Sequence, residues 1–229
     1  MDRTPAQAYN YQIFEPGPYV DAACDGPVVG EDLGDEPVWM LDGSRSSLRQ
    51  LTDGTLVLET GSTTCPLYRG NIRRMQRVAD RFTDVAFVVL YTREAHPGER
   101  RGAHRSRDDK LATAGRLADD AGEWRTIVVD DLDGPLHRRL EGAPNSVTIL
   151  DHHGEVIAYL HDSDPTAVAG VLEDLAAGRE PAIPRARFRP PTPRVAIGAL
   201  RRGGWQAVRD FLRGFPTLLR WRLGGGSGC

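Results

Sequence analysis

The sequence is poor in cysteine, nearly free of lysine, and without any long apolar run. Its three cysteines, Cys24, Cys65 and Cys229, have spacings that fit neither a disulfide framework nor a zinc site. Nearly all the positive charge is arginine, because Lys110 is the only lysine. No stretch of about 18 apolar residues predicts a transmembrane helix, and the first residues lack the apolar core of a signal peptide. We therefore expect a cytoplasmic protein in a reducing compartment.

Composition and charge are otherwise ordinary for a soluble protein. The net charge is −3, with 40% hydrophobic and 27% charged residues, so nothing global points to nucleic acid or to an acidic partner. Four regions are predicted along the chain. They are an irregular N-terminal extension (1–37), a globular domain (38–178), a proline-rich linker (179–193) and a basic helical tail (194–229).

Strand and helix patterns alternate within the globular domain. After a possible short hairpin over 38–49, apolar runs predict strands at 55–60, 85–91 and 126–130, and a hairpin formed by 146–150 and 156–160. Helical periodicity falls at 66–82, 108–121, 135–140 and 165–177. Parallel strands joined by helices, followed by a hairpin and a helix, are the layout of thioredoxin. The predicted fold class is α/β, a thioredoxin-like three-layer sandwich with a central mixed sheet.

Cys65 stands where the first of these strands meets the following helix, in the segment Gly61-Ser62-Thr63-Thr64-Cys65-Pro66. The free N–H groups and dipole of a helix N-terminus favour a thiolate, so we expect a lowered thiol pKa. The hydroxyls of Ser62, Thr63 and Thr64 are candidates to donate hydrogen bonds to it. The alternative is that Cys65 is a small buried hydrophobe.

Two further features favour a reactive cysteine. Pro144 precedes a hairpin strand, where thioredoxin folds place a cis-proline facing the cysteine, although an ordinary strand-entry proline fits equally well. Glu94 and His96 follow the next parallel strand, and neighbouring parallel strands end at the same crevice. We expect His96 to act as a general acid and Glu94 to orient it. The alternative is that both are solvated loop residues.

The site lacks a second cysteine. Tyr68 occupies the position where a Cys-x-x-Cys motif would have its partner thiol, which excludes a dithiol exchange like that of thioredoxin. An oxidised Cys65 must then be reduced by an external thiol, by Cys24 or by Cys229. No bound cofactor or metal is expected.

These segments resemble the iodothyronine deiodinase family, over roughly residues 55–177. The resemblance is carried by 61–66, by the strand 87–91 with Glu94-Ala95-His96-Pro97, by the strand 126–130 and by Ala143-Pro144. It implies that Cys65 takes the place of the family's selenocysteine, the nucleophile that removes a halogen, and that Glu94 and His96 match the pair implicated in proton delivery and substrate contact. Ser62 and Thr64 match the family's residues there, whereas Thr63 replaces a cysteine. A similar Ser-Thr-Thr-Cys run occurs in peroxiredoxins, but their upstream proline is Leu58 here.

The tail (194–223) has one acidic residue, Asp210, and a period close to that of a helix. Arginines 202, 209, 213 and 220 gather on one face and eight apolar side chains on the other, while Gly203-Gly204 and Pro216 should break or kink the helix. Such a helix suits an anionic membrane surface, with the protein peripheral at the inner face. The alternatives are docking on its own domain and self-association. No recognition motif supports nucleic-acid binding.

Two functions remain open from sequence. The first is a single-cysteine thiol oxidoreductase that is deiodinase-like. It would reduce an aromatic halide, a peroxide or a disulfide, with thioredoxin or a low-molecular-weight thiol as reductant. The second is a non-catalytic interaction module on a thioredoxin scaffold, localised by its tail.

Overall fold

The structure, a computed structural model, describes residues 4–17, 26–182 and 189–223. Its seven-stranded sheet has the order β2-β1-β5-β4-β3-β6-β7. The strands are β1 (Pro37–Met40), β2 (Arg45–Ser47), β3 (Leu56–Gly61), β4 (Ala86–Tyr91), β5 (Thr126–Val129), β6 (Val147–Leu150) and β7 (Val156–Leu160). β3, β4 and β5 are parallel neighbours, and the other pairs are antiparallel. The hairpin expected over 38–49 is formed by β1 and β2.

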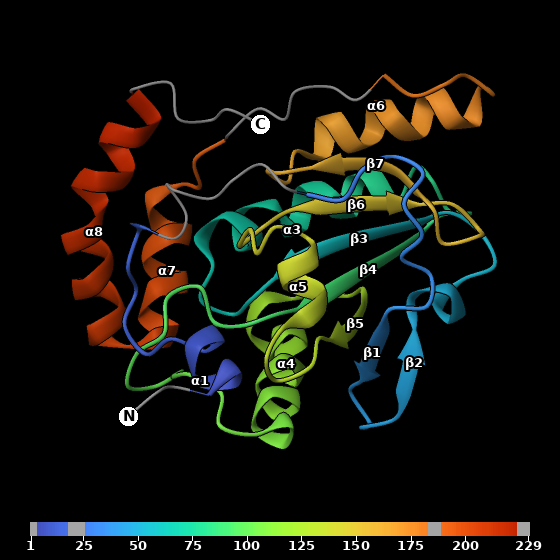
Figure 1. The fold of residues 1–229 in the computed structure, drawn as a ribbon. Helices are drawn as coiled ribbons and strands as arrows, with labels where there is room; N and C mark the ends of the chain where they lie inside the picture. Colours follow the sequence, from blue (N-terminus) through green and yellow to red (C-terminus); the bar gives the residue numbers. More distant parts are fainter. Residues whose placement is uncertain (1–3, 18–25, 183–188, 224–229) are drawn as a thin grey trace.

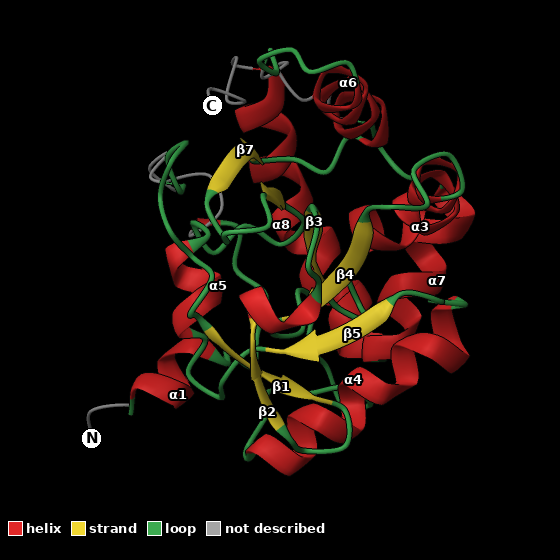
Figure 2. Cartoon of the chain, turned by 90° about the vertical axis from the view of Figure 1, so that its right-hand side faces the viewer, coloured by secondary structure: helices red, strands yellow, loops and turns green. Residues whose placement is uncertain are grey.

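The helices lie on both sides of the sheet (Figure 2). α3 (Pro66–Ala79), α4 (Arg107–Ala121) and α6 (Pro165–Ala176) cover one face, whereas α5 (Pro135–Arg139), the short α1 (Pro5–Tyr9) and the 3-10 turn η1 (Leu48–Leu51) belong to the other side. This follows from right-handed crossovers, since β3–α3–β4 and β4–α4–β5 step in the same direction across the sheet. The predicted thioredoxin-like three-layer sandwich is confirmed.

Side chains alternate between two cores because β3 and β4 are buried on both faces. Val57 and Phe87 point to the core under α3 and α6, and Leu56, Leu58 and Val88 point to the core beside α5. Both ends of α6 carry typical capping residues. Asp164 accepts a hydrogen bond from the backbone of Thr166, and Gly178 has a φ of +66° just beyond the last turn.

The N-terminal extension is less irregular than the sequence suggests. It holds α1, and Leu33 lies in the core beside α5, so part of this segment belongs to the folded domain. The tail forms α7 (Pro193–Gly203) and α8 (Trp205–Leu223), which lie side by side at one end of the sheet (Figure 1). The helix is interrupted at Gly203-Gly204 as expected, but α8 continues through Pro216. Within the described residues, no helix combines the length and apolarity needed to cross a bilayer.

Candidate active site around Cys65

Cys65 is the N-cap residue of α3 and is separated from the end of β3 by Ser62, Thr63 and Thr64. Its backbone is extended (φ −79°, ψ 114°), and Pro66 occupies the first helical turn, where a missing N–H costs nothing. The glycine at the end of β3 is required by packing, because a Cβ on Gly61 would lie 2.6 Å from the ring of Tyr68. The sequence Gly61-to-Pro66 therefore fixes a tight strand-to-helix junction that holds Cys65 at the end of the parallel strands.

The three hydroxyls before Cys65 all bond to the segment 94–96 that follows β4. The bonds are Ala95 N to Ser62 Oγ (3.2 Å), Thr63 Oγ1 to Glu94 Oε1 (2.8 Å), Thr64 Oγ1 to Glu94 Oε2 (2.5 Å) and His96 N to Thr64 Oγ1 (3.0 Å). The expectation that these two segments lie together is met. The hydroxyls of Thr63 and Thr64, however, give their protons to Glu94, so they are not free to donate to a thiolate.

Glu94 is 3% exposed and accepts four hydrogen bonds, two at each carboxylate oxygen. The fourth donor is Tyr91, whose hydroxyl lies 2.5 Å from Oε1. Tyr91 in turn lies 2.9 Å from Nε2 of His104. Because the phenol gives its proton to Glu94, Nε2 of His104 must be the donor in that contact. His104 is thus linked to the residue before Cys65 through Tyr91 and Glu94.

His96 lies beside this cluster but is not oriented by Glu94. In the described part of the chain no hydrogen bond joins the two side chains, and Nδ1 of His96 is buried without a partner. Phe14 and Phe211 cover the imidazole, with ring centroids 4.3 Å and 5.3 Å away. Burial lowers the pKa of His96 to about 3. The expected imidazolium acid is therefore a neutral base in this conformation.

The expected thiolate is likewise absent from this conformation. Cys65 is 2% exposed, and burial raises its pKa to about 12, with smaller contributions in the same direction from the charges of Glu59 and Glu94. The backbone amides of Tyr68 and Leu67 lower the pKa, as a helix N-terminus should, but the Cys65 sulfur accepts no capping hydrogen bond in the part of the chain that the structure describes. Desolvation outweighs the helix terminus here, and the prediction of a lowered pKa is wrong for this closed state.

Pro144 also differs from expectation. No cis peptide bond occurs among the described residues, so the predicted cis-proline is trans. Pro144 is half-buried in the loop before β6. Cys24 and Cys229, the two other candidate resolving thiols, lie outside the described residues.

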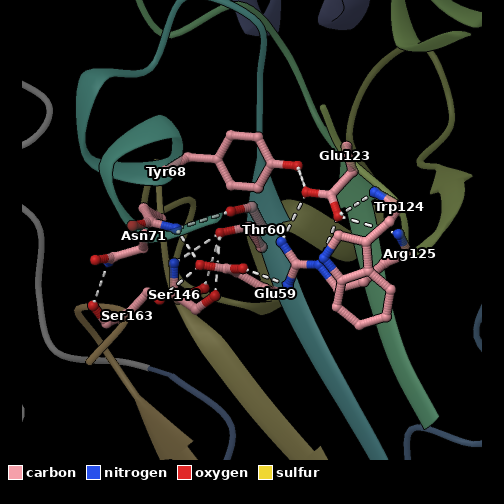
Figure 3. Close-up of polar contacts among 10 residues, drawn as sticks. Glu59, Thr60, Tyr68, Asn71, Glu123, Trp124, Arg125, Ser146 and Ser163 are labelled. Atoms are coloured by element: carbon pink, nitrogen blue, oxygen red, sulfur yellow. Dashed lines mark hydrogen bonds and ion pairs between the residues drawn. The ribbon is translucent and has the colours of Figure 1, made fainter. Parts of the chain in front are cut away.

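A buried polar network next to the site was not found by sequence analysis (Figure 3). Arg125 donates to Glu59 (2.5 Å) and, through Nε and Nη2, to both oxygens of Glu123 (2.8 Å each). Tyr68 donates to Glu123 at 2.5 Å, and burial raises the pKa of its phenol well above the ordinary value, which keeps this proton in place. The position that would hold a second thiol in a Cys-x-x-Cys motif instead joins α3 to this ion pair.

The remaining oxygen of Glu59 is also occupied. It accepts hydrogen bonds from Asn145 (3.1 Å) and from Ser163 (2.6 Å), and the carbonyl of Ser163 accepts one from Asn71 (Figure 3). Glu59 and Arg125 have fully buried side chains. One signal could have revealed this pair: a glutamate inside an otherwise apolar buried strand needs a cation, and Arg125 directly precedes β5.

The tail helices α7 and α8 cover the site at the edge of the sheet where the parallel strands β3 and β4 end. A Cβ on Gly203 would lie 2.6 Å from the carbonyl oxygen of His96 and 3.4 Å from Cγ2 of Thr64, and one on Gly98 would lie 2.4 Å from the Gly203 carbonyl. These glycines let the end of α7 rest directly on the backbone after Glu94. Glu99 then accepts hydrogen bonds from the first backbone amides of α8, those of Trp205 (2.5 Å) and Gln206 (2.9 Å).

The N-terminal segment completes the cover. The Tyr11 hydroxyl donates to the Ala95 carbonyl (2.9 Å), Tyr9 bonds to His137 (2.8 Å), and Phe14 reaches Phe211 of α8 at 6.4 Å between centroids. The N-terminal segment, through Phe14, and α8, through Phe211, therefore meet over His96. In the structure the tail is docked on its own domain, which is one of the three alternatives given for it. No group of three or more His, Cys, Asp or Glu side chains in the described ranges could hold a metal ion.

The fold and the site together make this a thioredoxin-like protein with a single cysteine, Cys65, at its strand-to-helix junction. The model of the iodothyronine deiodinase family matches residues 23–169. The chain belongs to that family. Membership supports a thiol-dependent oxidoreductase function.

Solved structures share the fold at low sequence identity. An uncharacterized conserved protein from Geobacillus kaustophilus matches with a TM-score of 0.52 and 13% identity, covering 69% of this chain and 87% of its own. A hypothetical protein from Sinorhizobium meliloti 1021 matches with a TM-score of 0.50 and 11% identity, covering 72% and 93%. At such identities the likeness concerns the fold alone.

Proposed function

We propose that this protein is a single-cysteine, thiol-dependent reductase of a small substrate, with Cys65 as the nucleophile. The observation that carries the proposal is the double attachment of Thr64 to Glu94, which fixes the cysteine junction against the Glu94–His96 segment. Family membership supports an aromatic halide as the substrate class. Peroxides and disulfides are the other electrophiles that a thiolate attacks, and substrate assays must include them.

The halide reaction balances with two external thiols. The Cys65 thiolate takes the halogen from the aromatic carbon, which receives a proton, and a sulfenyl halide forms. One external thiol displaces halide from that sulfur and leaves a mixed disulfide. A second thiol then releases Cys65 and forms the external disulfide. The substrate gains two electrons in total, and the two thiols lose them.

Opening of the cover is part of this proposal. In the closed conformation burial holds Cys65 as a neutral thiol and His96 as a neutral imidazole. Displacing Phe14 and Phe211 hydrates His96 and moves its pKa up towards the ordinary range, where it can deliver the proton. Hydration lowers the thiol pKa at the same time, because desolvation is its main cause. Glu94 acts as a positioning residue for the cysteine junction.

A second function, a non-catalytic module on this scaffold, is favoured by one observation. Cys65 is 2% exposed, as expected for a small buried hydrophobe. The two functions differ in whether the protein turns over a substrate when an external thiol is supplied.

The test uses a Cys24→Ser/Cys229→Ser background, in which Cys65 is the only thiol, and compares it with the same protein carrying Cys65→Ser. Both are given dithiothreitol and, in separate assays, iodotyrosines, hydrogen peroxide and a small disulfide. We expect turnover of one class in the first protein and its complete loss in the second. Equal turnover in both would contradict the enzyme, and no turnover by either would favour the module. The cytoplasmic location and the identity of the reductant stay predictions.

A further inference from the structure

The outward side of α8 carries a continuous apolar stripe. Its members are 45% to 79% exposed and are Trp205, Leu212, Phe215, Leu219 and Leu223. At 100° per residue they fall within an arc of about 80° along the whole helix. Large apolar side chains gathered in this way on a soluble surface mark an interaction site, whereas isolated ones do not.

The opposite side of α8 is already occupied. Ala207 and Gly214 are buried, and Phe211 packs on His96 of the domain. The apolar stripe is therefore what remains after the helix has docked. A partner can bind it without pulling α8 off the domain.

Within the tail itself the exposed charge beside the stripe has one sign, and the exposed Glu99, which accepts hydrogen bonds from Trp205 and Gln206, lies only at the N-terminal end of α8. Residues 189–223 contain eight arginines and one acidic residue, Asp210, which is 4% exposed. Arg209, Arg213 and Arg220 follow one edge of the stripe, about 80° to 120° from its centre. Arg209 and Arg213 approach Asp210 at 3.3 Å and 3.9 Å, yet their side chains remain 52% and 72% exposed. Along its length α8 thus offers apolar side chains beside cations, and its one acidic residue, Asp210, is buried.

The apolar stripe with arginines beside it distinguishes between two binding partners, a second copy of the chain and a membrane. A second copy packed stripe to stripe would offer these arginines no exposed acid of α8 as a partner, because Asp210 is buried. An anionic bilayer supplies both an apolar layer for the stripe and phosphate groups for the arginines. We propose that α8, docked on the domain, binds the surface of an anionic membrane and lies in its interface. This inference does not depend on the reaction at Cys65.

The experiment is co-sedimentation of the full chain with vesicles of phosphatidylcholine alone and with 30% phosphatidylglycerol. We expect binding to the anionic vesicles that weakens with salt, and little binding to the neutral ones. Leu212→Asp/Leu219→Asp should reduce the binding constant at least about tenfold. The matched control, Leu41→Asp, replaces a leucine of similar exposure (41%) on the β1–β2 turn and should leave binding unchanged. Thermal unfolding of each variant verifies that it is folded.

A second pair of variants tests the charge. Arg213→Gln/Arg220→Gln should weaken binding by about 25-fold, since each basic residue near an anionic surface contributes about fivefold. Arg73→Gln/Arg116→Gln, two exposed arginines on α3 and α4, should not. Failure to bind anionic vesicles, equal binding to neutral ones, or equal losses in both arginine pairs would overturn the proposal. A dimer in light scattering that Leu212→Asp/Leu219→Asp dissociates would overturn it in favour of self-association.

Discussion

Thr64 donates two hydrogen bonds to one oxygen of Glu94, from its backbone nitrogen at 2.8 Å and from its hydroxyl at 2.5 Å. The residue before the candidate nucleophile is therefore attached to the loop that follows the neighbouring strand, β4. A carboxylate can accept all four of its bonds only while both oxygens are acceptors. This geometry gives Glu94 a positioning role that does not require it to touch His96.

Glu94→Gln tests that role. The amide presents one acceptor and one donor, so two buried donors lose their partner and the junction before Cys65 loosens. We expect a loss of about 1–3 kcal/mol in the free energy of unfolding, measured with urea. Glu155→Gln, at an exposed position in the β6–β7 turn, should change it by less than about 0.5 kcal/mol. Equal effects of the two substitutions would contradict the positioning role.

The ion pair beneath the site makes a larger contribution. Arg125→Met leaves Glu59 and Glu123 buried without their cation, and breaking a buried pair in this way costs about 3–5 kcal/mol. Arg81→Met removes a surface pair with Glu173, whose side chains are 56% and 52% exposed, and should cost less than about 1 kcal/mol. Urea unfolding measures the free energy of unfolding of both variants. A difference below about 1 kcal/mol would show that Arg125 is not needed to balance these carboxylates.

His96 provides the pH-dependent prediction. Its pKa of about 3 lies below the ordinary value, so the folded protein takes up a proton less readily than the unfolded chain. This group therefore lowers stability as the pH falls below about 6.5, down to about 3. An NMR titration of the imidazole, assigned with His96→Gln, should show no charge change between pH 5 and 8.

Removing Phe14 or Phe211, the two rings that cover His96, should raise the pKa of His96 back towards its ordinary value. Phe211→Ala hydrates the imidazole and should raise the pKa of His96 by at least one unit. Trp205→Ala is the control, because it removes a still larger aromatic ring from the exposed side of α8. A His96 that titrates near 6.5 in the unaltered protein would show that Phe14 and Phe211 do not close the site.

Sequence patterns predicted the framework because each strand and helix is encoded locally. Apolar runs such as 85–91 and the periodicity of 66–82 placed β4 and α3 to within a few residues. The meeting of Cys65 with Glu94 and His96 was also predictable, since the ends of adjacent parallel strands share one edge. Burial was not, because it depends on which distant segments cover a site. For this reason the sequence did not reveal that burial raises the pKa of Cys65 and lowers that of His96, opposite to what their proposed roles require.

The tail shows the same limit. Periodicity grouped Phe211, Leu212, Phe215 and Leu219 on one apolar face, but Phe211 turns to the domain while the other three are exposed. The docked face is lined by Gly203, Ala207 and Gly214, small residues that carry little hydropathy signal and are chosen by close approach. Glu59 and Arg125 were missed for a related reason: sequence shows that a glutamate in a buried strand needs a cation, but which distant arginine supplies it depends on the tertiary fold.

The most direct test of a redox cysteine closed by the tail is the rate of Cys65 alkylation by iodoacetamide against pH, in the Cys24→Ser/Cys229→Ser background. With a pKa of about 12, the rate should rise from pH 7 to 10 without reaching a plateau. Gly203→Ala, which forces a Cβ onto the His96 carbonyl, should open the site, raise the rate at pH 8 at least about tenfold and bring the apparent pKa towards 8.5. Gly198→Ala, whose nearest contact would be 3.9 Å away, should change neither. A plateau near pH 8.5 in the protein with Gly203 intact, or equal rates with Gly203→Ala, would contradict the account.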